Sequence, residues 1–398
     1  MKQWIICWGV AMMFTSVPIR AQNSINTIID AVKKEYAPDK RVAIWEVEAT
    51  RTGKKITLTG KTNVPTAISA IHKKLSAQNI DFKDDITSLP DINLEGKTYG
   101  VVNVSVCNLR GEPKHRAELE NQAIMGTPIR YYEVKDGWYR AQTPEDYISW
   151  LDYGAATHWT KAEYDAWMSA PKVVFIPDFG FAYAKADSEA LKISDLVQGC
   201  ILKKIKQEEI YTIIEFPDGR MGFVETKNVM DYNLWLQTRK PIAETILSTA
   251  LQFVGRPYLW GGTSSKGIDC SGLTKCVFFW SGILLPRDAS QQVQIGEDVL
   301  TNKTTWENLR AGDLLFFGKP ATTEQPEKIT HVAIYLNHGE IIHASGNGSV
   351  KVESLDPSRP LFNKACYDSF VRAKRMLDVA GTKGVKLLTQ SEFYNSQN

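Results

Sequence analysis

Short strand-like segments separated by turn residues fill the chain from residue 99 to about residue 229, and no other feature constrains the fold as much. Short strands with turn signals every 8 to 12 residues or so are typical of small antiparallel barrels. The pattern runs twice, so we predict one barrel over residues 98–167 and a second over 168–236. The expected strands are 100–106, 127–132, 137–142 and 147–151, then 173–176, 199–202, 210–214 and 221–224.

Length and charge limit the remaining possibilities. A chain of 398 residues is longer than a domain with a single hydrophobic core usually is, so we expect several domains. With 43% apolar and 23% charged residues, the composition is that of a globular protein. The formal net charge is only +2, which is not the footprint of a nucleic-acid-binding protein.

The N-terminus has the pattern of a secretory signal peptide. Lys2 precedes an apolar run over residues 4–17, and the small residue Ala21 suits the position before a cleavage site. We predict a leader over residues 1–21; a retained membrane anchor is the alternative. No later segment is apolar enough to span a bilayer. We therefore expect an exported protein, periplasmic or extracellular, without stable membrane insertion.

Residues 22–97 are expected to form a small α/β domain. The spacing predicts helices over 24–36 and 65–75 and strands over 42–47 and 55–59. This pattern carries no recognisable chemistry, and it does not indicate what the domain contacts.

Loss of the leader would leave an odd number of cysteines, five, so at least one thiol is expected to be unpaired. They are Cys107, Cys200, Cys270, Cys276 and Cys366. None has Cys-x-x-Cys spacing, and the histidines do not follow a zinc pattern, so we expect no metal and no other cofactor.

Cys270 is the best candidate for a nucleophile. Asp269 is a good helix N-cap, and apolar residues follow Cys270 at helical spacing, so Cys270 should begin a buried helix. Helix-start amides favour negative charge and, with a partner histidine, are expected to lower the pKa of a thiol to roughly 3.5 to 7.5. The same amides could bind an oxyanion.

A nucleophilic cysteine needs a base and an orienting group, and a predicted hairpin offers both. His331 lies near the start of the strand 330–336, and His343 lies on the return strand 340–345. A three-residue loop would put His343 opposite Ala333 and on the same face as His331. A two-residue loop would put the histidines on opposite faces, and the triad would fail.

Residues 240–378 together resemble the NlpC-type cell-wall peptidase family, a small papain-like fold. The resemblance rests on Asp269-Cys270-Ser271-Gly272, the two histidines and the strand that follows residue 309. It implies an α+β catalytic domain, followed by a tail over 379–398, with Cys270 as nucleophile, His331 as base and His343 as orienter.

The two predicted barrels resemble bacterial SH3-like domains, the second less closely. Two such domains before an NlpC-type domain are similar to the dipeptidyl-peptidase VI type, which cuts γ-D-glutamyl-L-diamino acid bonds in murein peptides. In that type the first barrel closes the cleft, so that only a peptide with a free N-terminal L-Ala fits. The resemblance implies six substrate-binding residues. Glu118 and Asp269 would bind the ammonium group, and Tyr147 would accompany Glu118. Tyr258, Ser271 and Ser290 would line the L-Ala-γ-D-Glu pocket.

The sequence thus predicts a cysteine peptidase with a murein peptide as its partner. An N-acetylmuramoyl-L-alanine amidase of related fold and an idle wall-binding protein are the alternatives. The preference for diaminopimelate or lysine, the oligomeric state, and a role in recycling, scavenging or signalling stay open.

Overall fold

The computed structural model describes residues 17–53, 55–346 and 348–394, and these divide into two units at Leu89 and Pro90. Most of the predicted leader lies outside the described residues. Helix α1 (Val17–Tyr36) runs across the expected cleavage site after Ala21, and cleavage there stays a prediction. Among the described residues, no helix has the length and apolar character needed to cross a bilayer.

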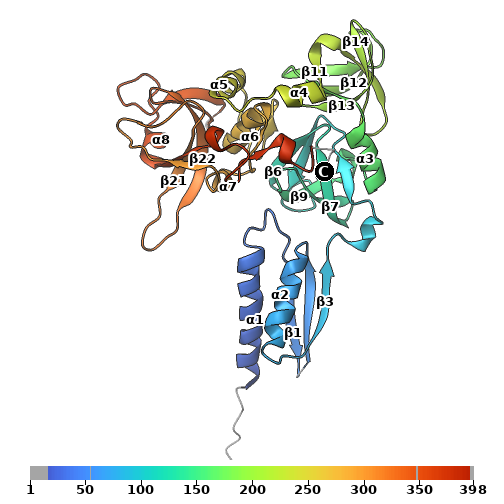
Figure 1. The fold of residues 1–398 in the computed structure, drawn as a ribbon, viewed down its shortest axis with the longest axis vertical. Helices are drawn as coiled ribbons and strands as arrows, with labels where there is room; N and C mark the ends of the chain where they lie inside the picture. The colour runs from blue at the N-terminus through green and yellow to red at the C-terminus, as the bar shows by residue number, and fades with distance from the viewer. Residues whose placement is uncertain (1–16, 54, 347, 395–398) are drawn as a thin grey trace, which may run out of the picture. The chain divides into compact units, whose positions relative to one another are not determined.

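The N-terminal unit packs α1 and α2 (Pro65–Ser76) against a three-stranded sheet (Figure 1). The sheet order is β1 (Glu48–Thr52), β2 (Lys55–Thr62), β3 (Phe82–Ser88), with β2 and β3 parallel.

The strand predicted over 42–47 is wrong, because only Trp45 makes an isolated bridge there. Two side chains also hold this segment: Asn63 Oδ1 accepts from the Ile44 amide at 2.7 Å, and the Thr62 hydroxyl donates to the Ile44 carbonyl at 2.7 Å.

Residues 99–152 form a six-stranded barrel sheet in the order β4-β7-β8-β9-β5-β6. Its strands are β4 (Tyr99–Val101), β5 (Val106–Arg110), β6 (Leu119–Ile124), β7 (Pro128–Lys135), β8 (Trp138–Gln142) and β9 (Ile148–Asp152). Helix α3 (Lys161–Ser169) follows, with Thr160 and Glu163 forming a capping box at its start.

The second barrel sheet has the order β12-β11-β15-β14-β13-β10-β16. Its strands are β10 (Lys172–Phe175), β11 (Phe179–Tyr183), β12 (Lys192–Val197), β13 (Ile201–Gln207), β14 (Tyr211–Glu215), β15 (Met221–Glu225) and β16 (Val229–Asp231). Helix α4 (Tyr232–Thr238) leads from it into the last domain.

The last domain packs helices against a six-stranded antiparallel sheet, which confirms the predicted α+β class (Figure 1). The sheet order is β20-β25-β21-β22-β23-β24. Its elements are α5 (Ala243–Gln252), α6 (Cys270–Trp280), α7 (Ala289–Gln292), β20 (Glu297–Val299), β21 (Leu314–Lys319), β22 (Lys328–Asn337), β23 (Glu340–Ala344), β24 (Val350–Ser354), α8 (Lys364–Ser369) and β25 (Phe370–Arg375). Leu273 and Val277 of α6 share one buried cluster with Val332 of β22, so this core sets where α6 begins relative to the sheet.

The segment after β25 packs back onto the domains before it. Strand β26 (Lys386–Leu387) pairs with β19 (Ile283–Leu284), and Phe393 joins a buried aromatic cluster with Trp235 and Trp280. The domain boundaries predicted from the sequence stay predictions.

Candidate active site

Cys270 is the first residue of α6, as predicted. The Asp269 side chain caps the helix by accepting from the Gly272 amide at 2.7 Å. Cys270 is buried, and its sulfur interacts with the backbone amide of Val332, the residue after His331 on β22. The helix start therefore brings the thiol to the strand that carries the predicted base.

The ionisation of this thiol differs from our expectation. Burial, and then the Asp269 carboxylate, raise the pKa of the Cys270 thiol to about 12. Burial, and then His343, lower the pKa of His331 to about 3. The prediction of a lowered thiol pKa rested on the helix-start amides and a partner histidine, and it left out the desolvation of both groups. Both shifts favour the neutral thiol and the neutral imidazole.

His331 and His343 are in direct contact. His331 Nε2 and His343 Nδ1 are 2.7 Å apart, and His343 Nε2 lies 2.7 Å from Glu353 Oε2. The Glu353 carboxylate, whose pKa the bond to His343 lowers to about 2, only accepts hydrogen bonds at neutral pH, so His343 carries its proton on Nε2. His343 Nδ1 then accepts from His331 Nε2, which leaves His331 Nδ1 with a free lone pair. A base needs this tautomer.

The β22–β23 hairpin combines both turn geometries that the sequence left open. Asn337 pairs with Glu340 around a two-residue turn, in which His338 and Gly339 both have positive φ, 45° and 78°. The register then shifts between Tyr335 and Asn337, and Ile334 pairs with Ile342. This β-bulge restores the register of a three-residue loop, so the two-residue turn does not separate the histidines.

A cleft of about 310 Å³ opens at the start of α6. It is lined by Cys270 and by all six predicted substrate-binding residues, Glu118, Tyr147, Tyr258, Asp269, Ser271 and Ser290. Burial, and then Cys270 and Asp269, raise the pKa of Tyr258 to about 12, so its hydroxyl stays protonated near the thiol.

Glu118 and Asp269 both line the cleft, but they differ in whether a counter-charge compensates the carboxylate. Asp269 is buried and binds the guanidinium of Arg287, with 2.6 Å between Oδ2 and Nη2. It also accepts from the Gly261 amide at 2.9 Å. Glu118 instead accepts one hydrogen bond, 2.8 Å from the indole nitrogen of the exposed Trp260, and has no ion-pair partner among the described residues. The negative charge of Asp269 is therefore compensated, and that of Glu118 is available.

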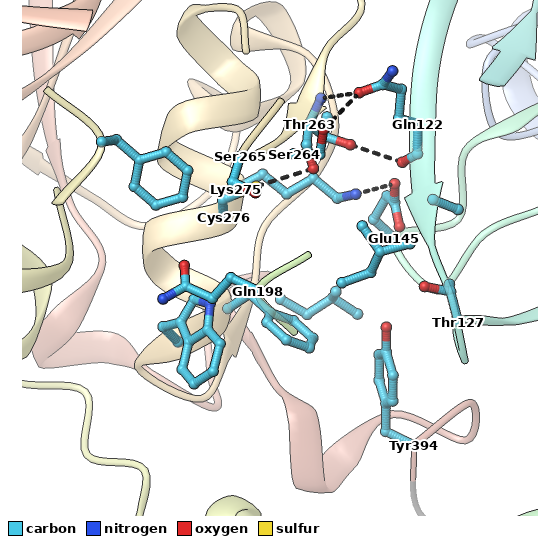
Figure 2. A pocket seen from close by; sticks show the side chains of 16 residues that line it. Gln122, Thr127, Glu145, Gln198, Thr263, Ser264, Ser265, Lys275, Cys276 and Tyr394 are labelled. Carbon is cyan, nitrogen blue, oxygen red and sulfur yellow. Dashed lines mark hydrogen bonds and ion pairs between the residues drawn. The ribbon is translucent and has the colours of Figure 1, made fainter. Parts of the chain in front are cut away.

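Buried polar contacts join the first barrel to the last domain (Figure 2). The Gln122 side chain accepts from the Thr263 amide at 3.0 Å, and the Gln122 carbonyl accepts from the Thr263 hydroxyl at 2.8 Å. Lys275 of α6 lies 2.8 Å from Glu145, beside a cavity of about 60 Å³. Burial opposes the charge on Glu145, but Lys275 keeps the pKa of that carboxyl below its ordinary value. These contacts position the barrel edge that carries Glu118.

Sequence reasoning missed several residues of the site. Arg287 stands three positions before Ser290, and a charged residue in that motif was an available signal. Glu353 is paired with Ile341 across β23 and β24, so it could be found only once that register was known. Glu120, which accepts from Ser149 at 2.6 Å, also lines the cleft.

Comparisons with known proteins match two parts of the chain. Residues 255–367 match the model of the NlpC/P60 family, and residues 109–154 match that of the bacterial dipeptidyl-peptidase SH3 domain. Dipeptidyl-peptidase 6 of Lysinibacillus sphaericus is 28% identical over 66% of this chain and 94% of its own length. The gamma-D-glutamyl-L-lysine dipeptidyl-peptidase of Bacillus subtilis (strain 168) is 37% identical over 32% of this chain and 40% of its own length.

The fold has a counterpart among solved structures. An NlpC/P60 family protein from Bacillus cereus ATCC 10987 aligns with a TM-score of 0.60 and 22% identity, over 70% of this chain and all of that one. The family match and the similar relatives define the chain as a hydrolase of the peptidase type. Its last domain belongs to the NlpC/P60 family, and the first barrel before it is a bacterial dipeptidyl-peptidase SH3 domain.

Proposed function

We propose that the chain hydrolyses the amide bond between γ-D-glutamate and a diamino acid in murein peptides that have a free N-terminal L-alanine. One observation carries the proposal: the Cys270 thiol and the Glu118 carboxylate, from two different domains, line the same cleft. The names of relatives, dipeptidyl-peptidase 6 and gamma-D-glutamyl-L-lysine dipeptidyl-peptidase, support the same bond.

In the proposed reaction His331 Nδ1 takes the thiol proton as the Cys270 sulfur attacks the γ-carbonyl carbon. The Gly272 amide is occupied by Asp269 and the Ser271 amide interacts with the Cys270 sulfur, so the Cys270 amide is the proposed helix-start donor for the oxyanion. The C–N bond then breaks, and His331 gives its proton to the leaving amine. Water, deprotonated by His331, hydrolyses the thioester. His343 holds the ring, and Glu353 holds His343.

The amino end of the substrate is assigned to Glu118. A carboxylate with uncompensated charge favours an ammonium group over an acylated amine. Tyr258, Ser271 and Ser290 would line the dipeptide pocket, and Tyr147 would accompany Glu118 at the ammonium group, as predicted from the sequence. Asp269 stays a predicted second ammonium partner, and its contacts also give it a role in fixing α6.

Mass spectrometry of products tests the proposed bond. Free L-Ala-γ-D-Glu-diamino acid peptides should release L-Ala-D-Glu, and Cys270→Ala should lower turnover by several orders of magnitude at an unchanged melting temperature. Release of whole stem peptides from muropeptides would indicate an amidase instead. Full activity of Cys270→Ala would overturn the proposal.

Acetylated substrates test the role of Glu118. N-acetylation removes the ammonium charge and adds bulk, so kcat/KM should fall at least about 100-fold. Glu118→Gln should shrink this ratio mainly by slowing the free peptide. Glu112→Gln is a matched control, because Glu112 forms an exposed ion pair with Lys114 on the same barrel. Equal rates on free and acetylated peptides would refute the closed cleft but leave the Cys270 chemistry standing.

We also propose that the protein acts outside the cytoplasm, after removal of the leader predicted over residues 1–21. N-terminal sequencing of the exported protein should then begin at Gln22.

A further inference from the structure

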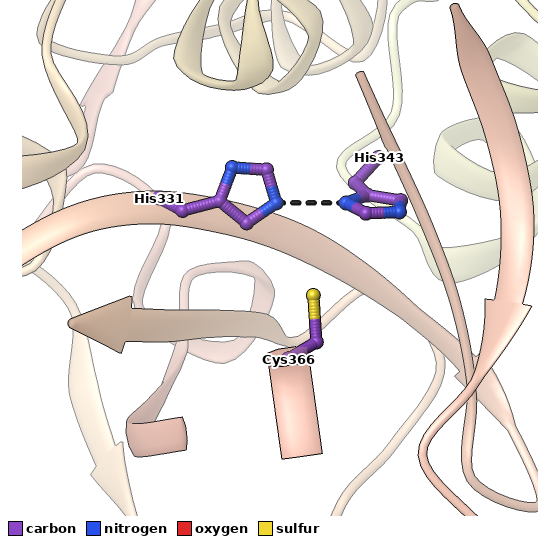
Figure 3. Close-up of side chains that lie close together, drawn as sticks. All are labelled: His331, His343 and Cys366. Atoms are coloured by element: carbon purple, nitrogen blue, oxygen red, sulfur yellow. Dashed lines mark hydrogen bonds between the residues drawn. The ribbon is translucent and has the colours of Figure 1, made fainter. Parts of the chain in front are cut away.

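A third side chain reaches the histidine pair from a part of the chain that the proposed reaction does not use. Cys366 of α8 points toward the contact between His331 and His343 (Figure 3). One donor atom from each of the three residues lies within 4.8 Å of the other two. Spacing along the sequence does not indicate this cluster, because its members come from β22, β23 and α8.

The network around Glu353 holds the cluster in place. Asn363 caps α8 by accepting from the Cys366 amide at 2.9 Å, and its side-chain amide donates to Glu353. Glu353 in turn binds His343 Nε2. The thiol of Cys366 is buried and has no hydrogen-bond partner among the described residues. One hydrogen-bond network therefore aims both His343 Nδ1 and the Cys366 thiol at the same point.

His343 already has the arrangement of a metal ligand. A ligating histidine usually donates its second ring N–H to a carboxylate, which fixes the tautomer and raises the basicity of the other nitrogen. Glu353 has this relation to His343, so Nδ1 presents a lone pair to the space shared with Cys366.

We propose that His331, His343 and Cys366 bind one zinc-like divalent cation, and that the bound cation switches the peptidase off. A tetrahedral zinc with bonds of about 2.0 Å to nitrogen and about 2.3 Å to sulfur sets its donors roughly 3.3 to 3.6 Å apart. The two ring nitrogens are 2.7 Å apart, so they must separate slightly while the thiol moves in. Two imidazoles and one thiolate suit zinc, cobalt or cadmium, and not magnesium or calcium.

The inhibition follows from the position of the protons and rests on the proposed function of His331. The metal takes the lone pair of His331 Nε2, so the ring proton must sit on Nδ1, and the Cys366 thiol releases its proton to water. Nδ1 is the atom that would accept the Cys270 proton. A protonated Nδ1 cannot act as the base, even though Cys270 stays free.

Metal binding is tested first without any need for activity. In Cys270→Ala, which removes the competing thiol, a titration with Co²⁺ should give one equivalent of binding with thiolate-to-cobalt charge-transfer absorption. Adding Cys366→Ala should abolish that absorption and weaken zinc binding at least about tenfold by calorimetry. Cys366→Ser, which nearly keeps the side-chain size, should also lose the absorption, and melting temperatures check that each variant is folded. An unchanged cobalt spectrum in folded Cys366→Ala would overturn the site.

Inhibition is tested next. Zn²⁺ should inhibit the full chain, and equal Mg²⁺ should not. Cys366→Ala should keep its basal rate and require at least about tenfold more Zn²⁺ for half inhibition. Cys276→Ala is the matched control and should stay as sensitive as the unmodified chain. Equal sensitivity of Cys366→Ala would place the inhibiting zinc on Cys270 and overturn the switch. If the chain has no peptidase activity, the proposed function fails, and the cobalt titration still decides the metal site.

Discussion

At the scale of single residues, burial favours the uncharged forms of both the proposed nucleophile and the proposed base. The Cys270 thiol has its pKa raised by burial, and the His331 ring has its pKa lowered by burial. A cleft that desolvates both groups disfavours the thiolate–imidazolium pair, because both of its members carry charge. In the proposed reaction, we therefore expect the thiol to lose its proton as it attacks the substrate.

This resting state predicts how alkylation depends on pH. A thiol whose pKa is about 12 is thiolate in a fraction that grows about tenfold per pH unit below that value. The iodoacetamide inactivation rate, followed by residual activity, should thus rise steeply between roughly pH 6 and 9. Cys270→Ala, checked by mass spectrometry, shows the background from the other four thiols. A rate that is already constant from pH 5 upward would show a preformed ion pair.

At the scale of elements, two strands and a helix cap hold the proposed orienting group, His343. Strand β24 presents Glu353 to His343 on β23, and the Asn363 cap of α8 binds the same carboxylate. Lys351 adds an ion pair at 2.6 Å from Glu353. The hydrogen bond to His343 lowers the pKa of Glu353 to about 2, so the carboxylate stays charged over the working pH range.

Glu353→Gln should therefore reduce activity without disrupting the cleft. The neutral amide can donate as well as accept, so it no longer fixes the proton of His343 on Nε2. We expect kcat to fall about 10- to 100-fold with little change in KM. Steady-state kinetics measure this. The control is Glu340→Gln on β23, which removes the ion pair between Glu340 and Arg359. A fall in Glu340→Gln as large as that in Glu353→Gln would indicate general loosening of the hairpin.

How far the sequence predicts these elements depends on the range of the interactions. The helix start at Cys270 was predictable because the Asp269 cap is local. The hairpin turn was not, because a bulge after Tyr335 offsets the two-residue turn. The neutral resting state was also missed, because desolvation depends on how α6 packs on β22, and sequence neighbours do not show it.

At the scale of the whole molecule, the cleft depends on an ion pair between domains. Glu145 of the first barrel is buried and binds Lys275 of α6 and Asn121. The contact stabilises the packing of the first barrel on the last domain only while both charges are present, because an unpaired buried charge is costly.

Lys275→Met should destabilise the protein by about 3 to 5 kcal/mol, since it leaves Glu145 buried without a counter-charge. The double variant Lys275→Met/Glu145→Gln should recover part of that loss. Urea unfolding followed by fluorescence measures both. A loss below about 1 kcal/mol in Lys275→Met would mean that water reaches Glu145.

The segment from β26 to Tyr394 has a consequence for the order in which the domains fold. Glu392 binds Arg130 of the first barrel at 2.8 Å, across 262 positions of sequence, and Phe393 packs with Trp235 and Trp280. Contacts that close such long loops form late in folding. The barrels can form early, but the contacts that fix the first barrel beside the last domain are complete only after this segment has packed. We therefore expect a variant without this segment to hold its first barrel less firmly beside the last domain.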